Sequence, residues 1–395
     1  MSLDFDLEDS ISFKILIIGK LMSLNETVLF KPVNFGQLSL RNRVVMAPMT
    51  RTFSPGGIPN DLNIAYYQRR AKNEVGLIIT EGTCVGHKAA NGYPNVPQFH
   101  GEEALAGWKK VVDAVHQEGG KIMPQLWHVG AIRKANQGVG PDESVPGYSP
   151  SGLVAKNKDS GHAMSHEEVL EVIESFVKAA EEAQKLGFDG VEIHGAHGYL
   201  LDQFFWEDTN IREDEFGGDI AERTKIGVDI VQQIKQRCGK DFPVILRFSQ
   251  WKQQDYNAKL AKTSQQLAQF LQPFVDAGVD IFRCSTRRFW EPEFEGSDLN
   301  LAGWTKKLTG KPTITVGSVG LNSGFIDEQK RDMIESSSVA SESFQQLENR
   351  LNNNEFDLVA VGRALLQDPE WVIKLKQDRV AELKDYSKKS LTELV

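Results

Sequence analysis

Cysteine is scarce in this chain, which contains only Cys84, Cys238 and Cys284. Their odd number and wide separation provide neither a disulfide framework nor a Cys-x-x-Cys metal knuckle, and this favours a reducing, cytoplasmic location. Because no cysteine follows Cys284, the ligands of an iron–sulfur cluster are missing from the later part of the sequence as well.

Long apolar runs are also missing. The segment from Ile11 to Leu21 imitates a targeting signal, but it is too short to span a bilayer, contains Lys14 and follows an acidic start. We therefore expect no membrane segment and interpret residues 1–28 as an N-terminal extension. Met22 could equally be the natural start of the protein.

The chain has no excess of basic residues, and its formal net charge is -9. A sequence-independent grip on nucleic acid needs clustered Lys and Arg, so nucleic acid is not an expected partner. The hydrophobic fraction of 40% and the charged fraction of 25% are those of a globular protein with ample core material. The expected partner is a small molecule, and the composition leaves both a monomer and a homo-oligomer open.

Short β-branched apolar runs recur along the chain, each followed by a longer stretch with helical spacing, and this alternation predicts βα units. Eight strands are expected, at Val44–Ala47, Leu77–Thr80, Met123–Leu126, Gly190–Ile193, Val244–Arg247, Ile281–Cys284, Thr313–Val316 and Leu358–Val361. The clearest helices are Glu167–Leu186, Arg223–Cys238 and Thr263–Ala277. Eight such units predict an α/β protein with a single (β/α)8 TIM barrel over residues 29–395. A doubly wound sheet is the alternative, although no strand is followed by a complete Gly-x-Gly-x-x-Gly turn.

Two stretches interrupt this rhythm. Gly130–Ser165 follows the third strand and is rich in Gly, Pro and Ser, so we predict a capping excursion over the active face. Asn322–Phe356 lies between the last two strands and is predicted to hold the seventh helix plus an insertion.

Chemistry in such a barrel is located where the strands end. Gly317 and Gly362 directly follow strands seven and eight, where a glycine lets the backbone approach a ligand and a following helix N-terminus supplies N–H groups. With the fixed positive fork of Arg363, the two glycines predict a phosphate site. Each glycine taken alone could also be a plain turn.

Thr50, Gln125 and Arg247 come from three other strands and could converge on the barrel mouth. A flat, electron-accepting ring needs hydroxyl or amide groups at its carbonyl edge and a cation where negative charge gathers on reduction. Hydrogen bonding to nearby backbone is the alternative for Thr50 and Gln125. An unpaired buried cation is costly, so Arg247 is expected to meet an acidic or electron-rich partner.

The end of strand four carries His194, His197 and Tyr199, separated by small residues that would leave the rings room in a pocket. As a metal site the pair of histidines is weak, because the other strand ends supply Thr, Gln and Arg instead of further His and carboxylate ligands. No metal is therefore expected. The two histidines could instead donate hydrogen bonds to one anionic oxygen, while the phenol of Tyr199 supplies a proton.

Taken together, these runs resemble the Old Yellow Enzyme family of NAD(P)H-dependent flavin oxidoreductases, from about Leu29 to Trp371. The run Asn210–Gly218, followed by Glu222 and Arg223, is similar to the family's stretch after the fourth strand. The resemblance implies that FMN is bound, and that NADPH or NADH reduces it before an electron-poor alkene is reduced in the same place. It places the FMN phosphate on Gly317, Ser318, Gly362 and Arg363, and the ring against Pro48, Met49, Thr50, Gly82, Gln125 and Arg247.

The resemblance also implies roles around the substrate. His194 and His197 would hold the carbonyl or nitro oxygen, Tyr199 would protonate the α carbon, and Trp127 would shape the pocket. The His-x-x-His form and Thr50 are similar to the bacterial branch that includes pentaerythritol tetranitrate reductase.

The sequence departs from the family pattern in three places. Phe216 replaces the more usual Tyr, and the run Cys284–Phe294 is not the common version. The tail beyond Arg363 lacks the expected pocket-closing aromatic, a role that we assign to Phe289 or Trp290. Two alternatives stay open: a dienoyl-CoA reductase-like enzyme without the iron–sulfur segment, and a barrel that binds flavin without turnover.

Overall fold

The computed structural model describes residues 27–395 except 141, 322–325, 328–331 and 334–340. The expected N-terminal extension, residues 1–28, thus lies outside the described residues apart from its last two positions. Part of the predicted insertion at 322–356 lies outside them as well.

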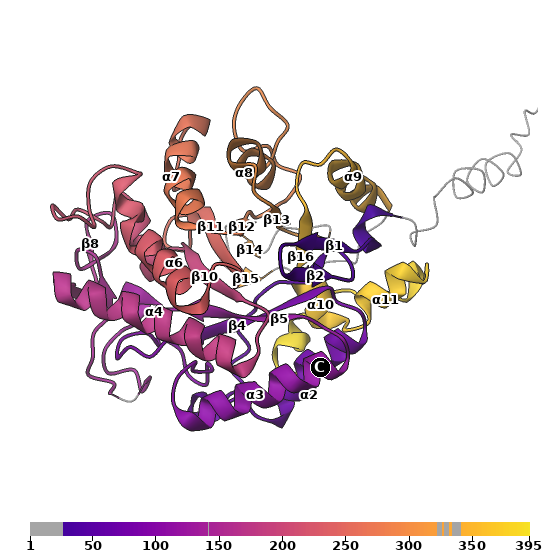
Figure 1. Ribbon diagram of the computed structural model, residues 1–395, viewed down its shortest axis with the longest axis horizontal. Helices are drawn as coiled ribbons and strands as arrows, with labels where there is room; N and C mark the ends of the chain where they lie inside the picture. The colour runs from indigo at the N-terminus through magenta and orange to yellow at the C-terminus, as the bar shows by residue number, and fades with distance from the viewer. Residues whose placement is uncertain (1–26, 141, 322–325, 328–331, 334–340) are drawn as a thin grey trace, which may run out of the picture.

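Eight parallel strands close into a barrel at the centre of the molecule, with helices around it (Figure 1). In order around the barrel they are β3 (Val44–Met46), β4 (Leu77–Cys84), β5 (Ile122–Trp127), β10 (Val191–His197), β11 (Val244–Lys252), β12 (Ile281–Ser285), β13 (Thr313–Val316) and β16 (Leu358–Val361). The barrel closes where β16 pairs with β3, with Val359 aligned to Val44. This confirms the predicted (β/α)8 fold and all eight predicted strands, and it excludes the doubly wound sheet.

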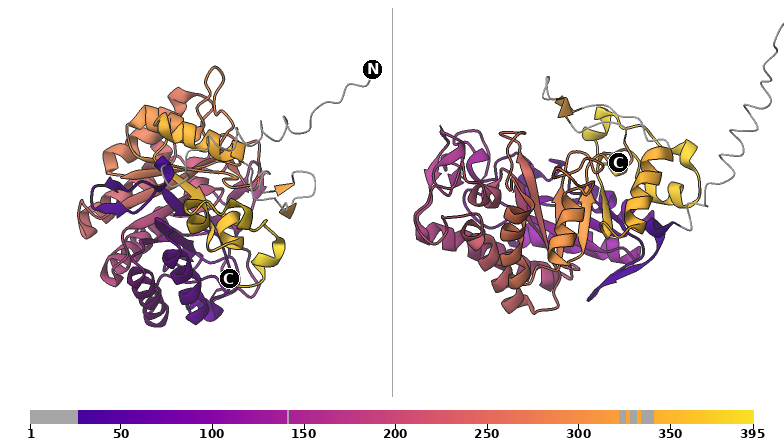
Figure 2. Two further views of the ribbon diagram at one scale, coloured as in Figure 1. Left: turned by 90° about the vertical axis from the view of Figure 1, so that its right-hand side faces the viewer. Right: turned by 90° about the horizontal axis from the view of Figure 1, so that it is seen from above.

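Helices cover the outside of the barrel (Figures 1 and 2). They are α2 (Asp61–Lys72), α3 (Glu102–Gln117), α4 (His166–Leu186), α5 (Leu200–Phe205), α6 (Lys225–Cys238), α7 (Ser264–Ala277), α8 (Leu301–Thr309), α9 (Ser341–Asn352), α10 (Arg363–Gln367) and α11 (Trp371–Lys376). The helix α4 begins with a reciprocal cap, in which Ser165 and Glu168 each accept the other's backbone N–H. It ends at Gly187 in the left-handed conformation, with φ 87°.

The alternation of side chains along the strands creates two apolar clusters. The inward set fills the barrel and comprises Val45, Ala47, Leu77, Ile79, Met123, Ile245, Ile281, Ile314, Leu358 and Ala360. Leu38 and Leu40 belong to the same cluster and come from the hairpin of β1 (Val33–Phe35) and β2 (Leu38–Leu40). This hairpin leads into the start of β3, so it closes the N-terminal end of the barrel and leaves the C-terminal end for the site.

The two predicted interruptions are present as small added structures. After β5, β6 (Tyr148–Ser149) pairs with β9 (His162–Ala163), and β7 (Leu153–Ala155) pairs with β8 (Lys158–Asp159). Between β13 and β16, the described part holds the pair β14 (Ile326–Asp327) and β15 (Asp332–Met333), followed by α9 as the predicted seventh helix. No described residue of the excursion after β5 lines the main cavity, so its covering role stays a prediction.

Candidate active site

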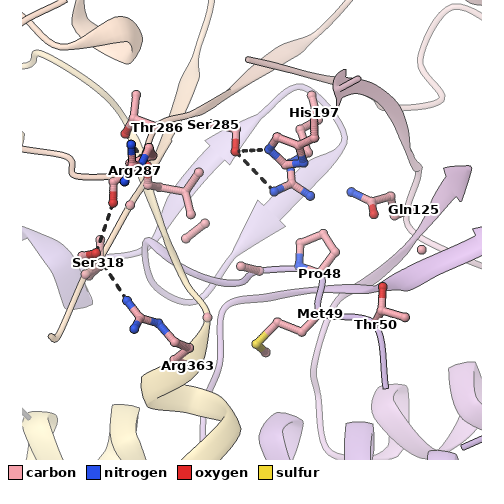
Figure 3. Close-up of a pocket in the computed structure, with 18 of the residues that line it drawn as sticks. Pro48, Met49, Thr50, Gln125, His197, Ser285, Thr286, Arg287, Ser318 and Arg363 are labelled. Atoms are coloured by element: carbon pink, nitrogen blue, oxygen red, sulfur yellow. Dashed lines mark hydrogen bonds between the residues drawn. The ribbon is translucent and has the colours of Figure 1, made fainter. Parts of the chain in front are cut away.

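A cavity of about 400 Å³ lies at the C-terminal ends of the barrel strands. This volume is within the range of sites that hold cofactors and small molecules. Its wall contains every residue that the sequence predicted for cofactor and substrate: Pro48, Met49, Thr50, Gly82, Gln125, Trp127, His194, His197, Tyr199, Arg247, Gly317, Ser318, Gly362 and Arg363. Figure 3 shows Ser318 and Arg363 at one end, His197, Gln125 and Thr50 at the other, and Pro48 and Met49 between them.

Gly317 and Ser318 after β13, together with Gly362 and Arg363 after β16, form one end of the cavity. We call this positively charged end the cationic cradle. Ser318 donates its hydroxyl to the carbonyl of Arg287 at 3.1 Å and accepts from Nη2 of Arg363 at 3.4 Å (Figure 3). Gly317 has φ 145°, and a Cβ there would lie 2.8 Å from the Thr286 carbonyl, so the close approach of the β12 loop requires glycine. Burial lowers the pKa of Arg363 to about 10, which still leaves the guanidinium charged at neutral pH.

The helix that follows β16 supplies the N-terminus that was expected at this end of the cavity. It is α10, which has five residues, so its dipole adds little. The cradle can therefore hold a phosphate through backbone N–H groups and the Arg363 fork more than through a helix end.

The segment carrying Pro48, Met49 and Thr50 is held from behind by Glu81, a residue that the sequence pattern did not single out. Oε2 of Glu81 accepts the backbone N–H of Arg51 at 2.8 Å. Burial raises the pKa of this carboxyl to about 7. Glu81 thereby fixes the loop that forms the floor of the cavity.

Gly82 has a packing reason to be glycine. A Cβ at this position would lie 2.7 Å from Cε3 of Trp127. The close approach of Trp127 to β4 therefore needs Gly82, whether or not a ligand is bound.

A charged network lies beneath the floor. Nε2 of Gln125 donates to Oε1 of Glu192 at 2.6 Å, and Glu192 forms an ion pair with Nε of Arg283 at 2.8 Å. Both charged side chains of this pair are fully buried. The sequence pattern did not single out this pair, because Glu192 and Arg283 each lie inside an otherwise apolar run.

Arg247 faces the cavity above this network. Its Nη2 donates to Oγ of Ser285 at 3.3 Å, and its Nε is buried without a hydrogen-bond partner among the described residues. Burial and then the charge of Arg283 lower the pKa of Arg247, while Glu192 opposes them. The acidic or electron-rich partner that the sequence led us to expect for Arg247 is thus not a direct ion pair within the described residues. Glu192 acts on Arg247 through space, because its own ion pair is with Arg283.

The cavity wall fits the flavin ring that the resemblance implies. An unsatisfied guanidinium nitrogen beside a second buried cation suits a ring edge that gains negative charge on reduction. The amide of Gln125 and the exposed Thr50 supply neighbouring polar groups.

His194 can donate a hydrogen bond into the cavity. Its Nδ1 accepts the backbone N–H of Ala196 at 3.3 Å, so a neutral ring carries its proton on Nε2. Burial lowers the pKa of His194 well below its ordinary value and keeps the ring neutral. Its ring stacks on Trp127 with centroids 6.2 Å apart.

His197 is placed differently from His194. It follows an irregularity in the pairing of β10 with β11 and has φ 65°, an unusual value for a residue other than glycine. Its Nε2 lies 2.8 Å from Oγ of Ser285 (Figure 3), and its ring stacks on Trp251 at 4.5 Å. A ligand oxygen at His197 would therefore share that histidine with Ser285, which sequence reasoning did not identify.

Tyr199 completes the predicted constellation. Its hydroxyl lies 3.2 Å from Nε2 of Gln253 and 3.3 Å from the hydroxyl of Tyr93. Burial raises the pKa of Tyr199 well above its ordinary value, so the phenol is protonated at neutral pH. Its ring meets Trp127 edge to face at 4.9 Å. A buried phenol beside a hydrogen-bond donor for an oxyanion can serve as a general acid.

A buried ion pair positions this part of β10. Asp202 on α5 pairs with Lys252 at the end of β11, and both side chains are fully buried. Asp202 also accepts the backbone N–H of Gly198 at 2.7 Å. The pair thus joins the backbone between His197 and Tyr199 to the neighbouring strand.

The prediction that Phe289 or Trp290 closes the pocket was wrong. Phe289 is fully buried in the core, its ring packs against Trp290 at 5.2 Å, and neither residue lines the cavity. Further aromatic wall residues are Trp251 at the end of β11, Tyr256 in the loop after it, and Tyr386 in the tail. The error arose because the tail brings Tyr386 against Arg363 from a distance in sequence that no local pattern reveals.

Comparison with known proteins identifies the family. The sequence matches the profile of the NADH:flavin oxidoreductase / NADH oxidase family over residues 28–382. The chain belongs to this family. The match covers all eight barrel strands and every cavity residue up to Arg363, and it confirms the resemblance to Old Yellow Enzyme, whereas the closer likeness to the pentaerythritol tetranitrate reductase branch stays a prediction.

Individual relatives agree with this assignment. A putative 12-oxophytodienoate reductase 2 of Oryza sativa subsp. japonica is 39% identical over 217 residues, covering 53% of this chain and 56% of that protein. An NADH oxidase of Thermoanaerobacter brockii is 32% identical over 367 residues, covering 90% of this chain and 52% of that protein. This flavin oxidoreductase family member thus spans little more than half the length of these curated relatives.

Solved structures show the same fold. Morphinone reductase in complex with tetrahydroNAD superposes with a TM-score of 0.76 at 27% identity, covering 92% of this chain and 93% of that one. Old Yellow Enzyme from Pichia sp. AKU4542 gives a TM-score of 0.76 at 25% identity, covering 93% and 91%. Within the described ranges, no helix of this family member is long and apolar enough to cross a membrane.

Proposed function

We propose that the protein is an FMN-dependent ene-reductase that uses NADPH or NADH to reduce electron-poor alkenes. The observation that carries the proposal is one cavity with a cationic cradle at one end and His194, His197 and Tyr199 at the other. The proposed substrates are α,β-unsaturated carbonyl compounds, with nitro compounds and quinones as further electron acceptors. The family assignment and the tetrahydroNAD complex of morphinone reductase support a nicotinamide co-substrate.

Ser318 and Arg363 would hold the phosphate of FMN and the wall around Arg247 would hold its ring, and the bound cofactor would supply hydride transfer from the nicotinamide to the β carbon of the alkene. The chain's own residues bind the substrate oxygen and polarise the double bond conjugated to it. Nε2–H of His194 donates to the substrate oxygen, and His197 approaches the same oxygen from its position beside Ser285. These contacts withdraw electrons from the double bond, and Tyr199 then gives its phenolic proton to the α carbon.

Tyr199→Phe tests the proposal, because the phenol has a role in only one half of the reaction. Positioned proton transfer contributes about 10²- to 10⁴-fold, so reduction of a simple enone should slow by an amount in that range. Reduction of the flavin by the nicotinamide should stay near the wild-type rate. Stopped-flow absorbance of the flavin measures each half separately.

Tyr66→Phe is the matched control, since Tyr66 is a buried tyrosine on α2 that does not line the cavity. Both half-reactions should be unchanged in it. Equal losses in both halves of Tyr199→Phe would show that Tyr199 shapes the pocket and is not the acid. A flavin-loaded wild type that reduces no acceptor would instead favour the alternative of a non-catalytic flavin-binding barrel.

A further inference from the structure

Two tyrosines meet at the rear of the cavity. The hydroxyl of Tyr93, in the loop after β4, lies 3.3 Å from the hydroxyl of Tyr199. Tyr199 lines the cavity, whereas Tyr93 does not, and Tyr93 is the more exposed of the two. Tyr93 is half-buried and the next two loop residues, Pro94 and Asn95, are exposed, so Tyr93 offers a path from solvent to Tyr199.

Both rings are held in place by Trp127. Tyr93 stacks on it with ring centroids 5.6 Å apart and planes 16° apart, while Tyr199 meets it edge to face. The backbone N–H of Tyr93 donates to Oδ1 of Asn91 at 2.9 Å, which fixes the loop locally. The packing of both rings against Trp127 thus holds the two hydroxyls in contact.

A buried phenol that has given up its proton must recover one before the next turnover. Tyr199 is 8% exposed, and its phenolate would be costly in that surrounding. Gln253 can stabilise the phenolate through its amide N–H at 3.2 Å, but an amide does not give up a proton at neutral pH. The other polar rings and cations facing Tyr199 are His194, which holds the substrate oxygen, and Arg247, a guanidinium that cannot be deprotonated.

We propose that Tyr93 returns the proton to Tyr199 and in turn draws one from water, so that the two phenols form a relay from solvent to the substrate carbon. The inference rests on the proposed function, in which Tyr199 is the acid. The Tyr199 O–H bond breaks as the α C–H bond forms; the Tyr93 O–H bond then breaks as the Tyr199 O–H bond re-forms. Water supplies the last proton, and no electron moves in the relay.

Tyr93→Phe in the FMN-loaded protein tests the relay, because it removes the hydroxyl and keeps the ring that stacks on Trp127. A relay acts after the first proton transfer, since Tyr199 begins protonated. In sequential-mixing stopped flow, the first reduction of an enone by prereduced enzyme should match wild type. The second reduction by the same enzyme should slow about 10²-fold, the lower end of the contribution of positioned proton transfer.

Two further readouts separate a relay from a structural role. A pH-indicator dye should show that proton uptake from solvent keeps pace with flavin oxidation in wild type and lags behind it in Tyr93→Phe. Imidazolium or dihydrogen phosphate in the buffer, as small proton donors, should restore the second turnover of the variant. Tyr66→Phe should resemble wild type in both measurements.

The outcomes are distinct. A first turnover slowed as much as the second, with no rescue by small acids, would mean that Tyr93 only positions Tyr199. An unchanged second turnover would mean that water reaches Tyr199 directly. Either result overturns the relay while leaving the proposed function intact, whereas an unaffected Tyr199→Phe would overturn the proposed function itself.

Discussion

Arg363 is the residue whose role can be isolated most cleanly, because it lies at the end of the cavity away from His197. Its guanidinium contacts Ser318 and Tyr386 and keeps its charge at neutral pH. A phosphate placed there would gain charge-assisted hydrogen bonds, and the ring of the same cofactor would not.

We therefore expect Arg363→Met to weaken FMN binding and to leave riboflavin, which has no phosphate, unaffected. A hydrogen bond to a charged group contributes about 1.5–3 kcal/mol, so the Kd for FMN should rise about 10- to 150-fold. Titration of the flavin-free protein with each flavin, followed by quenching of flavin fluorescence, measures both constants. Arg379→Met is the control, since Arg379 forms an exposed ion pair with Glu382. Equal weakening for both flavins would place the phosphate elsewhere.

At the scale of elements, the site depends on how β10, α5 and β11 are joined. The fully buried pair of Asp202 and Lys252 connects them at a point where His197 and Lys252 are paired neighbours. Removing one partner of a buried pair leaves an uncompensated charge, which typically costs about 3–5 kcal/mol.

Asp202→Asn should accordingly lower the free energy of unfolding by about 3–5 kcal/mol, as measured by urea denaturation. Asp113→Asn removes the acid of the pair with Lys109, whose side chains are 50% and 48% exposed, and should cost less than about 1 kcal/mol. If the two substitutions cost the same, the buried pair does not hold these elements together.

The sequence predicted the strands because apolar runs mark the inside of a barrel, but it misplaced where several of them end. Pairing in β4, β10 and β11 continues to Cys84, His197 and Lys252, beyond the predicted ends at Thr80, Ile193 and Arg247. The added residues are mostly polar or small, since they form the mouth of the barrel. A search for apolar runs therefore does not recognise them as part of a strand. The predicted ligand residues were found because they lie next to these ends.

Other residues of the site could not be found in this way. Ser285 acts through His197 and Arg247, which are distant in sequence. Tyr93 and Tyr386 come from loop and tail positions whose neighbours are set only by folding. Local pattern carries no information about such contacts.

For the whole molecule, buried histidines should make stability depend on pH. Burial lowers the pKa values of His128, His194 and His197 well below their ordinary value. Below the unfolded-state pKa of about 6.5, the unfolded chain binds protons that the folded chain does not. The free energy of unfolding therefore decreases as the pH is lowered. Each histidine contributes up to about 1.4 kcal/mol per pH unit. Burial also lowers the pKa of His87 to about 4, so this histidine adds to the other three. Glu81, whose folded pKa is raised to about 7, acts in the opposite sense and offsets one of the four.

The unfolded histidines are already half protonated at pH 6.5, so each net proton contributes about 1 kcal/mol over the next pH unit. We therefore expect the free energy of unfolding to fall by roughly 3 kcal/mol between pH 6.5 and 5.5, the share of three net protons. Urea denaturation with FMN in excess at several pH values gives the slope. His128→Asn should remove about one histidine's share of it, because His128 does not line the cavity. A free energy of unfolding that is constant over this interval would show that the histidines can be protonated in the folded state.

The hairpin of β1 and β2 has a practical consequence for handling the protein. It puts Val28 and Leu29 at the closed end of the barrel, where the Leu29 carbonyl accepts the N–H of Arg43 just before β3. The other terminus behaves differently, because Leu391 lines the cavity and the carbonyl of Val395 accepts from Arg70. A surface linker joined at Val28 would hold the barrel with its mouth facing outward, whereas a linker joined near Leu391 would strain the wall of the cavity.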